Sequence, residues 1–395
     1  MYNQIKESFN KLYEYCNAQG FKGYDPYDGL NSRFFQSLPF IRKSRLARLI
    51  WIQFFKRSPL NIRPVTGIRK EYNPKALGLF LSGYCALYKS DARKEYSDKI
   101  RFFCDKIKEM SVPGLSGASW GYNFDWESKA FFQPKNMPTI VVSSFIANSL
   151  IDAYEITGDK ELLSLARSTC DYILNDLNRT FDDKGNFAFS YSKIDHSVVF
   201  NATLLGSRLL ARVYRFTGEK KLIDEAKKSV DYCCSYQRPD GSWTYGLYPF
   251  HQWIDSFHTG YNLECISDYI KFSGDHTCEQ NLVIGFEYYI NTFFTSEGIA
   301  RYYNNSIYPI DIHAPAQLVI TLSRLGKFQE NIGLVNNVLK YTIKHMQSKE
   351  GFFYYQINKF FTSKIPYMRW SQAWMFYALS NYLLETSGEN DQKEG

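Results

Sequence analysis

Three Asp–His pairs recur along the middle of the sequence, and their side chains could carry acid–base chemistry. The pairs are Asp195-His196, Asp255 with His258, and Asp311 with His313. The chain has six histidines in all, so three pairs in successive segments are a clear concentration. An Asp and a His can serve together as general acid and general base. An Asp before a helix is also an ordinary N-cap, and a duplicated structural motif would give the same pattern.

The residues around these pairs allow two kinds of reaction on a sugar. A Tyr–His pair could remove the proton beside a uronate carboxylate, as in elimination or epimerisation, with Arg301 or Arg369 neutralising that carboxylate. Two carboxylates in different environments could instead hydrolyse a glycosidic bond. The sequence leaves lyase, epimerase and hydrolase open. The candidate catalytic residues are Asp195, His196, Tyr245, Asp255, His258, Asp311 and His313.

Aromatic residues gather in the same segments. The chain has 31 Tyr, 31 Phe and 7 Trp, and Tyr and Trp combine an apolar ring with a polar tip that suits contact with sugars. An aromatic-rich core would give the same composition. We expect the following residues to bind substrate: Trp120, Tyr122, Trp126, Trp243, Trp253, Tyr261, Arg301, Tyr302, Arg369 and Trp370.

An internal repeat must position these segments. Nearly uncharged stretches end at a glycine followed by a charged residue, at Gly158, Gly218, Gly274 and Gly326. Glycine suits the left-handed C-cap of a helix, and a charged amphipathic stretch, such as 160–177, comes next. Each copy therefore predicts a buried inner helix followed by a solvent-facing outer helix.

Six copies predict a closed ring. The inner helices are expected near 73–89, 138–157, 197–217, 257–273, 312–325 and 368–387, and a glycine–aromatic loop follows each outer helix. Five outer helices follow within the chain, and the sixth could come from 1–18 or 43–57. We predict an all-α (α/α)6 toroid with short aromatic loop segments rather than an open solenoid, because the inner helices are too apolar to line an open groove. Residues 1–70 would pack on or close the ring, 71–390 would form it, and 391–395 would be a disordered tail.

This pattern resembles the six-hairpin toroids of carbohydrate-active enzymes over roughly residues 70–390. Those include the C-terminal domain of glucuronyl C5-epimerases, unsaturated glucuronyl hydrolases, toroidal polysaccharide lyases and toroid proteins of bacterial polysaccharide gene clusters. The resemblance implies an enzyme acting on a complex, uronate-containing glycan in polysaccharide biosynthesis or modification. In such a ring the loops before the inner helices meet at one mouth, where helix N-termini favour an anion.

Two alternatives to a glycan-acting enzyme stay open. The segment Gln237–Trp243 matches the Gln-xxx-Gly-x-Trp motif of triterpene cyclases once, so a terpenoid cyclase or prenyltransferase is one of them. Such enzymes need an acidic cluster, and the candidate pair Asp182-Asp183 lies in a glycine turn. The other alternative is a non-catalytic scaffold that binds glycan without turning it over.

The positive charge of the chain is local. The net charge is +7, but residues 41–70 hold nine Lys and Arg and no acid, which leaves the rest at −2. A near-neutral body argues against nucleic-acid binding. Residues 41–57 have a basic amphipathic pattern, typical either of a helix that contacts a membrane surface or of an outer helix of the ring.

Several common motifs are absent from the sequence. The N-terminal stretch has no apolar core of a secretory signal. The eight cysteines form no CxxC pair, which favours reduced, buried thiols. We therefore expect a cytoplasmic protein, and the basic pattern of 41–57 suggests a peripheral position at the inner membrane face. No HExxH, zinc spacing or nucleotide-binding motif occurs, so neither a metal nor another cofactor is expected.

Overall fold

A computed structural model describes residues 1–390, so the predicted tail at 391–395 lies outside the described residues. Inner and outer helices alternate along the chain. The inner helices are α5 (Pro74–Ser90), α7 (Ile140–Thr157), α9 (Phe200–Thr217), α11 (Ser256–Ser273), α13 (His313–Arg324) and α15 (Trp374–Asn390). The outer helices are α6 (Lys94–Glu109), α8 (Lys160–Asp176), α10 (Lys220–Ser235), α12 (Glu279–Phe293), α14 (Ile332–Met346) and α1 (Tyr2–Ala18).

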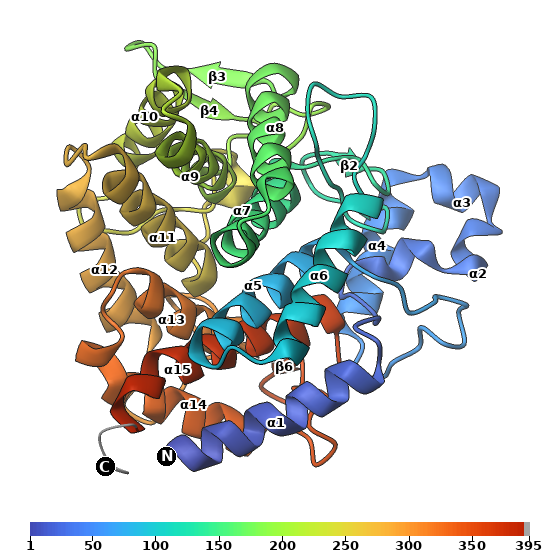
Figure 1. Cartoon of the computed structure of the whole chain (residues 1–395). Coiled ribbons are helices and arrows are strands. Elements are labelled where there is room, and N and C mark those ends of the chain that lie inside the picture. Colours follow the sequence, from blue (N-terminus) through green and yellow to red (C-terminus); the bar gives the residue numbers. More distant parts are fainter. Residues whose placement is uncertain (391–395) are drawn as a thin grey trace.

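The inner helices close into a ring, which confirms the predicted all-α (α/α)6 toroid. Each packs against the next, from α5 through α7, α9, α11 and α13 to α15, and α15 packs back against α5. The inner helices are buried along most of their length. Charged side chains within them pair with one another, as Arg212 of α9 does with Asp152 of α7 at 2.6 Å. Figure 1 shows α1, from the start of the chain, lying beside α14 and α15 from its end.

The repeat signals act as turns between these helices. Gly158, Gly218 and Gly274 end inner helices with φ of 70°, 68° and 72°, the left-handed conformation expected of a glycine C-cap. α7 alone among the helices of residues 1–390 is long and apolar enough to cross a membrane, but 72% of that stretch is buried inside the ring. Its apolar sequence is therefore accounted for by the core.

The loop glycines join one hairpin to the next. A Cβ on Gly241 would lie 2.3 Å from the carbonyl oxygen of Ile284 in α12, so only glycine allows this approach. The same contact recurs at Gly298 against Asn337 of α14 and at Gly351 against Lys11 of α1. α1 therefore takes the place of the sixth outer helix.

The glutamine of the cyclase-like motif has the same joining role. The Gln237 side-chain amide donates to the carbonyl oxygen of Asn281 in α12 at 2.9 Å. Gln347, four residues before Gly351, donates in the same way to the carbonyl oxygen of Ser8 in α1 at 2.9 Å. The motif is thus explained by packing between hairpins.

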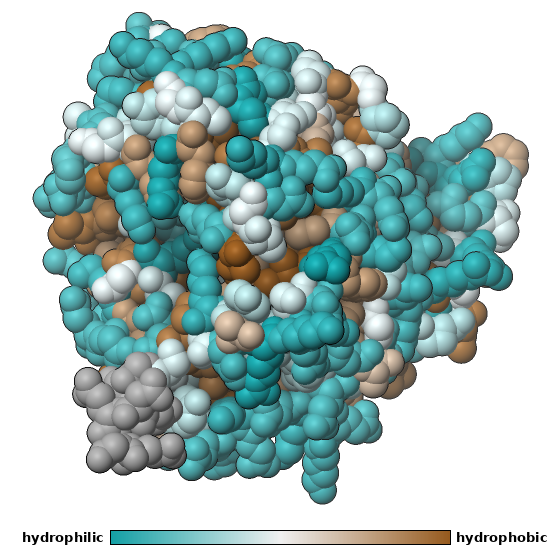
Figure 2. Space-filling model, viewed as in Figure 1, coloured by the Kyte–Doolittle hydropathy of each residue, from teal (hydrophilic) through white to brown (hydrophobic). Residues whose placement is uncertain are grey.

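The rest of the N-terminal segment lies beside the ring mouth. It comprises a 3-10 turn (Asp28–Asn31) and the helices α2 (Arg33–Gln36), α3 (Pro39–Lys43) and α4 (Arg45–Arg57). These helices project from the ring at the right of Figure 1, and Figure 2 shows hydrophobic and hydrophilic residues mixed on that projection. α4 packs on the 3-10 turn and on β1, so it is not an outer helix of the ring.

Short antiparallel strands lie in the loops, although of the predicted glycine–aromatic pieces only the one after Gly185 forms a strand of residues 1–390. They are β1 (Trp126–Glu127) with β2 (Phe132–Gln133), β3 (Arg179–Phe181) with β4 (Phe187–Phe189), and β5 (Ile310–Asp311), β6 (Gln356–Ile357) and β7 (Thr362–Ser363) in one sheet. Further 3-10 turns cover Pro249–His251 and Gln329–Asn331, and a π-helical turn, Met368–Ala373, leads into α15. These loops and the N-terminal segment build the mouth.

Candidate active site

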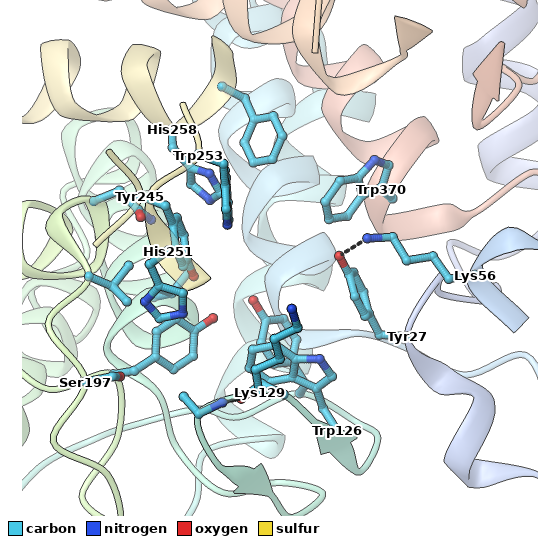
Figure 3. Close-up of a pocket in the computed structure, with 18 of the residues that line it drawn as sticks. Tyr27, Lys56, Trp126, Lys129, Ser197, Tyr245, His251, Trp253, His258 and Trp370 are labelled. Atoms are coloured by element: carbon cyan, nitrogen blue, oxygen red, sulfur yellow. Dashed lines mark hydrogen bonds between the residues drawn. The ribbon is translucent and has the colours of Figure 1, made fainter. Parts of the chain in front are cut away.

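A cavity of about 470 Å³ opens where the inner helices begin (Figure 3). Its lining combines aromatic rings with cations and histidines, and among residues 1–390 no Asp or Glu lines it. The rings are those of Tyr27, Tyr122, Phe124, Trp126, Phe131, Tyr191, Tyr245, Phe250, Trp253, Phe257, Tyr261, Tyr302, Tyr303 and Trp370. The cations are Lys56, Arg57, Lys75, Lys129 and Arg369, and the histidines are His251, His258 and His313. The ligand chemistry that fits is therefore anionic.

The Asp255–His258 pair is both a helix cap and an oriented base. Asp255 is the N-cap of α11, and its Oδ1 accepts the backbone N–H of His258 at 2.9 Å. Its Oδ2 lies 2.8 Å from Nδ1 of the His258 ring. Because a carboxylate only accepts hydrogen bonds, Nδ1 carries a proton, and in the neutral form of the ring the lone pair is therefore on Nε2. Asp255 is buried behind the cavity wall, so His258 is the member of the pair that can touch a ligand.

His313 is paired with a tyrosine rather than with its Asp. Its Nε2 lies 2.8 Å from the Tyr261 hydroxyl, and its ring stacks on Phe257 with centroids 4.3 Å apart. Burial lowers the pKa of His313 well below its usual value, and the nearby charges of Lys75, His258 and Arg369 lower it further. Burial also raises the pKa of Tyr261 well above its usual value. The Tyr261 hydroxyl therefore keeps its proton and donates to a neutral His313.

Asp311 holds the wall of the cavity and does not reach the His313 ring. Its Oδ1 accepts the backbone N–H of His313 and the indole N–H of Trp370, each at 2.9 Å, and its Oδ2 accepts from Gln356. Burial raises its pKa from 3.8 to about 6. The Asp311 carboxylate accepts from three donors and lies outside the cavity lining, so its role is to position Trp370. The expected pairing of Asp311 with the His313 side chain is therefore not formed.

The third pair, Asp195-His196, does not contribute to the cavity. Asp195 is buried and accepts hydrogen bonds from the backbone and hydroxyl groups of Ser192 and Ser197. His196 is exposed, and only Ser197 of this loop lines the cavity. The Asp195 carboxylate therefore stabilises its own loop. This pair resembles the other two in sequence but does not share their position at the cavity.

Three expected substrate-binding residues lie elsewhere. Trp120 and Trp243 are buried, and their indole N–H groups donate to the carbonyl oxygens of Ile107 at 2.8 Å and Cys233 at 3.0 Å. Both tie a loop to the outer helix before it. Arg301 is half-buried and does not line the cavity. The Trp243 ring, which follows the turn glycine Gly241, thus faces the core rather than the cavity.

The other expected residues do line the cavity. They are Tyr122, Trp126, Tyr245, Trp253, Tyr261, Tyr302, Arg369 and Trp370, together with His258 and His313. The Tyr245 and Trp253 rings stack with centroids 4.3 Å apart, forming a flat aromatic surface beside His258 (Figure 3). Arg369 is buried and forms a two-point ion pair with Asp25 of the N-terminal segment. The lining thus includes ten of the seventeen different residues proposed from the sequence.

Lys75 is the main residue that the sequence reasoning missed. It lies in the first turn of α5, and its Nζ is 4.0 Å from the centre of the Phe145 ring. It forms no ion pair with any carboxylate of residues 1–390, although its side chain is buried. Burial lowers its pKa well below the usual value, and the charge of Arg369 lowers it further. The available signal was a lysine at the start of an inner helix whose other charged residue, Lys89, lies in the last turn.

The N-terminal segment also completes the cavity. Tyr27 lines it, and its hydroxyl accepts a hydrogen bond from Lys56 of α4 at 2.9 Å (Figure 3). Its contact with the mouth depends on chain segments far apart in sequence, so no local pattern could have placed it. No group of three His, Cys, Asp or Glu that could hold a metal ion occurs within residues 1–390.

Comparison with known proteins identifies a fold. No family model matches the chain, and no curated protein matches its sequence. Cellobiose 2-epimerase from Bacillus thermoamylovorans aligns with a TM-score of 0.63 at 12% identity, over 80% of this chain and 88% of that one. An unsaturated glucuronyl hydrolase specific for heparin aligns with a TM-score of 0.60 at 15% identity, over 83% and 90%.

A third similar structure has a different named activity. It is a glycoside hydrolase family 76 α-mannanase from Bacteroides thetaiotaomicron, with a TM-score of 0.61 at 12% identity, over 81% of this chain and 87% of that one. Proteins of such different named activities share the architecture, so the likeness does not select a reaction. The chain therefore has the (α/α)6 toroid fold of the six-hairpin glycosidases and related epimerases.

Proposed function

We propose that the protein is an enzyme that removes a proton from carbon in an acidic sugar unit of a complex glycan, as a lyase or an epimerase. The observation that carries this proposal is the cavity lining, which has an Asp-oriented histidine and five cations but no carboxylate. Hydrolysis of the usual kind needs two carboxyl groups flanking the glycosidic bond. The lining therefore favours proton abstraction over hydrolysis.

The proposed reaction begins with a uronate bound against Arg369 and Lys75. Their charge, or a proton held by Lys75, would stabilise the negative charge that develops on the carboxylate when the adjacent C–H bond breaks. Nε2 of His258 would take that proton. In an elimination the C–O bond to the leaving sugar then breaks and a C=C bond forms. In an epimerisation a proton returns to the opposite face of the same carbon.

Tyr261 is the proposed acid. In the resting cavity its hydroxyl donates its proton to the hydrogen bond with Nε2 of His313, and it would turn that proton to the substrate. The proton would go to the leaving oxygen in an elimination or to the carbon in an epimerisation. The proton that His258 has taken would then return to Tyr261 through water, which restores both groups. The stacked rings of Tyr245 and Trp253 would hold a sugar face beside His258.

The decisive experiment compares two histidine substitutions. The protein is incubated in D₂O with a panel of uronate-containing oligosaccharides, and deuterium uptake and ultraviolet absorbance of unsaturated product are followed. His258→Gln should lower the rate by about a hundredfold to ten-thousandfold, because it removes the base. His196→Gln is the matched control, since His196 is exposed and outside the cavity, and it should leave the rate unchanged.

Other outcomes would reject the proposal. Release of new reducing ends without deuterium uptake or unsaturation would indicate hydrolysis. Binding of the oligosaccharides without any turnover would favour the glycan-binding scaffold. Circular dichroism of each variant separates a lost base from a lost fold.

The biological setting is also a proposal. A role in polysaccharide biosynthesis and a cytoplasmic location are supported by the sequence resemblance and by eight cysteines that are all free and buried. Contact with the inner face of a membrane is supported by the projecting N-terminal segment, where the side chains of Phe40 and Val65 are 89% and 85% exposed. Exposed apolar side chains among cations suit an anionic lipid surface.

A further inference from the structure

A second, apolar hollow lies next to the sugar cavity, between α4 and the loop that carries β1. It has a volume of about 830 Å³. Its apolar lining includes Leu49, Ile50, Phe54, Pro59 and Trp126. Ile50 and Phe54 are four residues apart on one face of α4, and both are exposed. We call this hollow the α4 groove.

The α4 groove adjoins the sugar cavity. Tyr27, Gln53, Arg57, Trp126, Ser128 and Lys129 line both. Figure 3 shows Trp126 and Lys129 on one side of the cavity and Tyr27 with Lys56 on another. The two spaces are therefore close enough for a single elongated ligand to reach from one to the other.

Free cations mark the junction of the two spaces. Arg57 and Lys129 line both, Lys56 lines the cavity, and none of the three forms an ion pair with a carboxylate of residues 1–390. The one acid that lines the groove, Glu127, is already neutralised by Arg48 at 2.7 Å and by Arg45. The junction therefore offers unpaired positive charge between an apolar surface and an aromatic one.

The groove is built into the fold. Arg48 holds α4 to the loop through Glu127, and Arg45 donates to the carbonyl oxygen of Lys129. On the other side of α4, Ile52 and Phe55 are buried against the N-terminal segment. These contacts fix the exposed face of α4 opposite the loop, so the groove does not need a ligand to form it.

We propose that the ligand is a lipid-linked glycan. Its sugar would enter the cavity, an anionic phosphate link would sit at Lys56, Arg57 and Lys129, and its lipid chain would lie along the α4 groove. The apolar groove, the cationic junction and the aromatic cavity follow one another in the same order as the lipid chain, the phosphate and the sugar of such a molecule. A peptide would leave its backbone groups without partners against an apolar wall, which disfavours it. The sugar part of this inference rests on the function proposed above.

The lipid and phosphate parts can be tested without any glycan. Binding of dodecyl phosphate and butyl phosphate, each below its micelle concentration, is measured by calorimetry and by quenching of tryptophan fluorescence. We expect dodecyl phosphate to bind at least about tenfold more tightly than butyl phosphate, because only the longer chain reaches along the groove. Dodecanol should bind more weakly than dodecyl phosphate, because it lacks the anion.

Matched substitutions locate the binding. Ile50→Ser and Phe54→Ser should each weaken dodecyl phosphate binding by about tenfold and leave butyl phosphate unchanged. Arg57→Ala with Lys129→Ala should weaken both phosphates. Leu60→Ser is the control, because Leu60 is exposed and outside the groove. All these side chains are on the surface, so the variants should keep the fold.

Three results would overturn the inference. The first is equal binding of the two phosphates, and the second is dodecyl phosphate binding that Ile50→Ser and Phe54→Ser do not change. The third is evidence that the groove contacts a membrane or a second copy of the protein instead. In that case the substitutions would change only sedimentation with vesicles, or only a dimer measured by analytical ultracentrifugation. His258→Gln should leave dodecyl phosphate binding intact. If the protein binds dodecyl phosphate but turns over no glycan, the proposed function fails. If it turns over glycan but does not bind dodecyl phosphate, the lipid-linked ligand fails.

Discussion

The two Asp–His pairs at the mouth differ because of one residue of spacing. Asp255 is an N-cap with His258 three positions later, where the carboxylate can reach both the backbone N–H and the ring. Asp311 comes two residues before His313, so it reaches only the backbone N–H, and the His313 ring turns to Tyr261. The spacing alone would have ranked Asp255–His258 as the more chemically suited pair.

Asp311 gives a pH prediction at the scale of one residue. Its pKa is raised from 3.8 to about 6 by burial, so the folded protein holds this proton more tightly than the unfolded chain. The free energy of unfolding should therefore fall as the pH rises through that window. Asp311→Asn has no proton to lose, so its stability relative to the unsubstituted protein should improve by about 2 kcal/mol between about pH 4 and about pH 7.

Urea unfolding at a series of pH values measures this difference. Curves that stay parallel for the two proteins would show that Asp311 does not titrate in this window. If the stability of Asp311→Asn relative to the unsubstituted protein instead fell as the pH rose, the three hydrogen-bond donors to Asp311, rather than its burial, would set its pKa.

At the scale of elements, glycine has two separate roles in the repeat. Gly158 ends a helix in open space, and no atom lies within 4 Å of a Cβ placed on it. Gly241 has a positive φ as well, but the carbonyl oxygen of Ile284 blocks the place of its Cβ. The first glycine is required by backbone conformation, and the second by conformation together with contact between hairpins.

The two glycines make a matched pair of substitutions. Gly158→Ala should cost about 1–2 kcal/mol of stability, the strain of a left-handed alanine. Gly241→Ala should cost more, about 3 kcal/mol or above, because α12 must also move away. Thermal and urea unfolding of both variants measure the difference, and equal losses would contradict the proposed contact between hairpins.

At the scale of the whole molecule, the basic segment has several distinct roles. Arg45 and Arg48 hold α4 to the loop, and Arg63 is fully buried in an ion pair with Asp28 at 2.7 Å. Arg42 and Lys43 are exposed and belong to no ion pair of residues 1–390. The local charge of +9 is therefore divided between internal anchors, the junction of the cavity and a smaller free surface.

This division shapes the membrane prediction. The protein should sediment with vesicles that contain anionic lipid, and Phe40→Ser with Arg42→Ala and Lys43→Ala should weaken that binding by about tenfold or more, since each cation contributes about 1 kcal/mol near such a surface. Phe360→Ser is the control, because Phe360 is equally exposed in the turn between β6 and β7. Absence of sedimentation, or equal loss in the control, would reject membrane contact through this segment.

The ring was predictable from the sequence because its determinants are local. A helix that ends at Gly158 or Gly218 needs only the conformational freedom of glycine, and an uncharged stretch such as that of α7 must be buried whatever surrounds it. The glycine–aromatic loops likewise marked the neighbourhood of the mouth. The division into an N-terminal segment at 1–70, which packs on or closes the ring, and a toroid domain at 71–390 stays a prediction.

The tertiary structure alone decided which side chains share the cavity. Trp120 and Trp126 occur in the same aromatic loop, but one donates to an outer helix and the other faces the cavity, because the loop turns between them. Lys75 meets Arg369 across the closed ring, and Tyr27 and Lys56 reach the mouth only because the N-terminal segment folds over it. Ring closure brings together residues hundreds of positions apart, and a sequence pattern fixes the direction of a side chain within its own helix but not its neighbours across the ring.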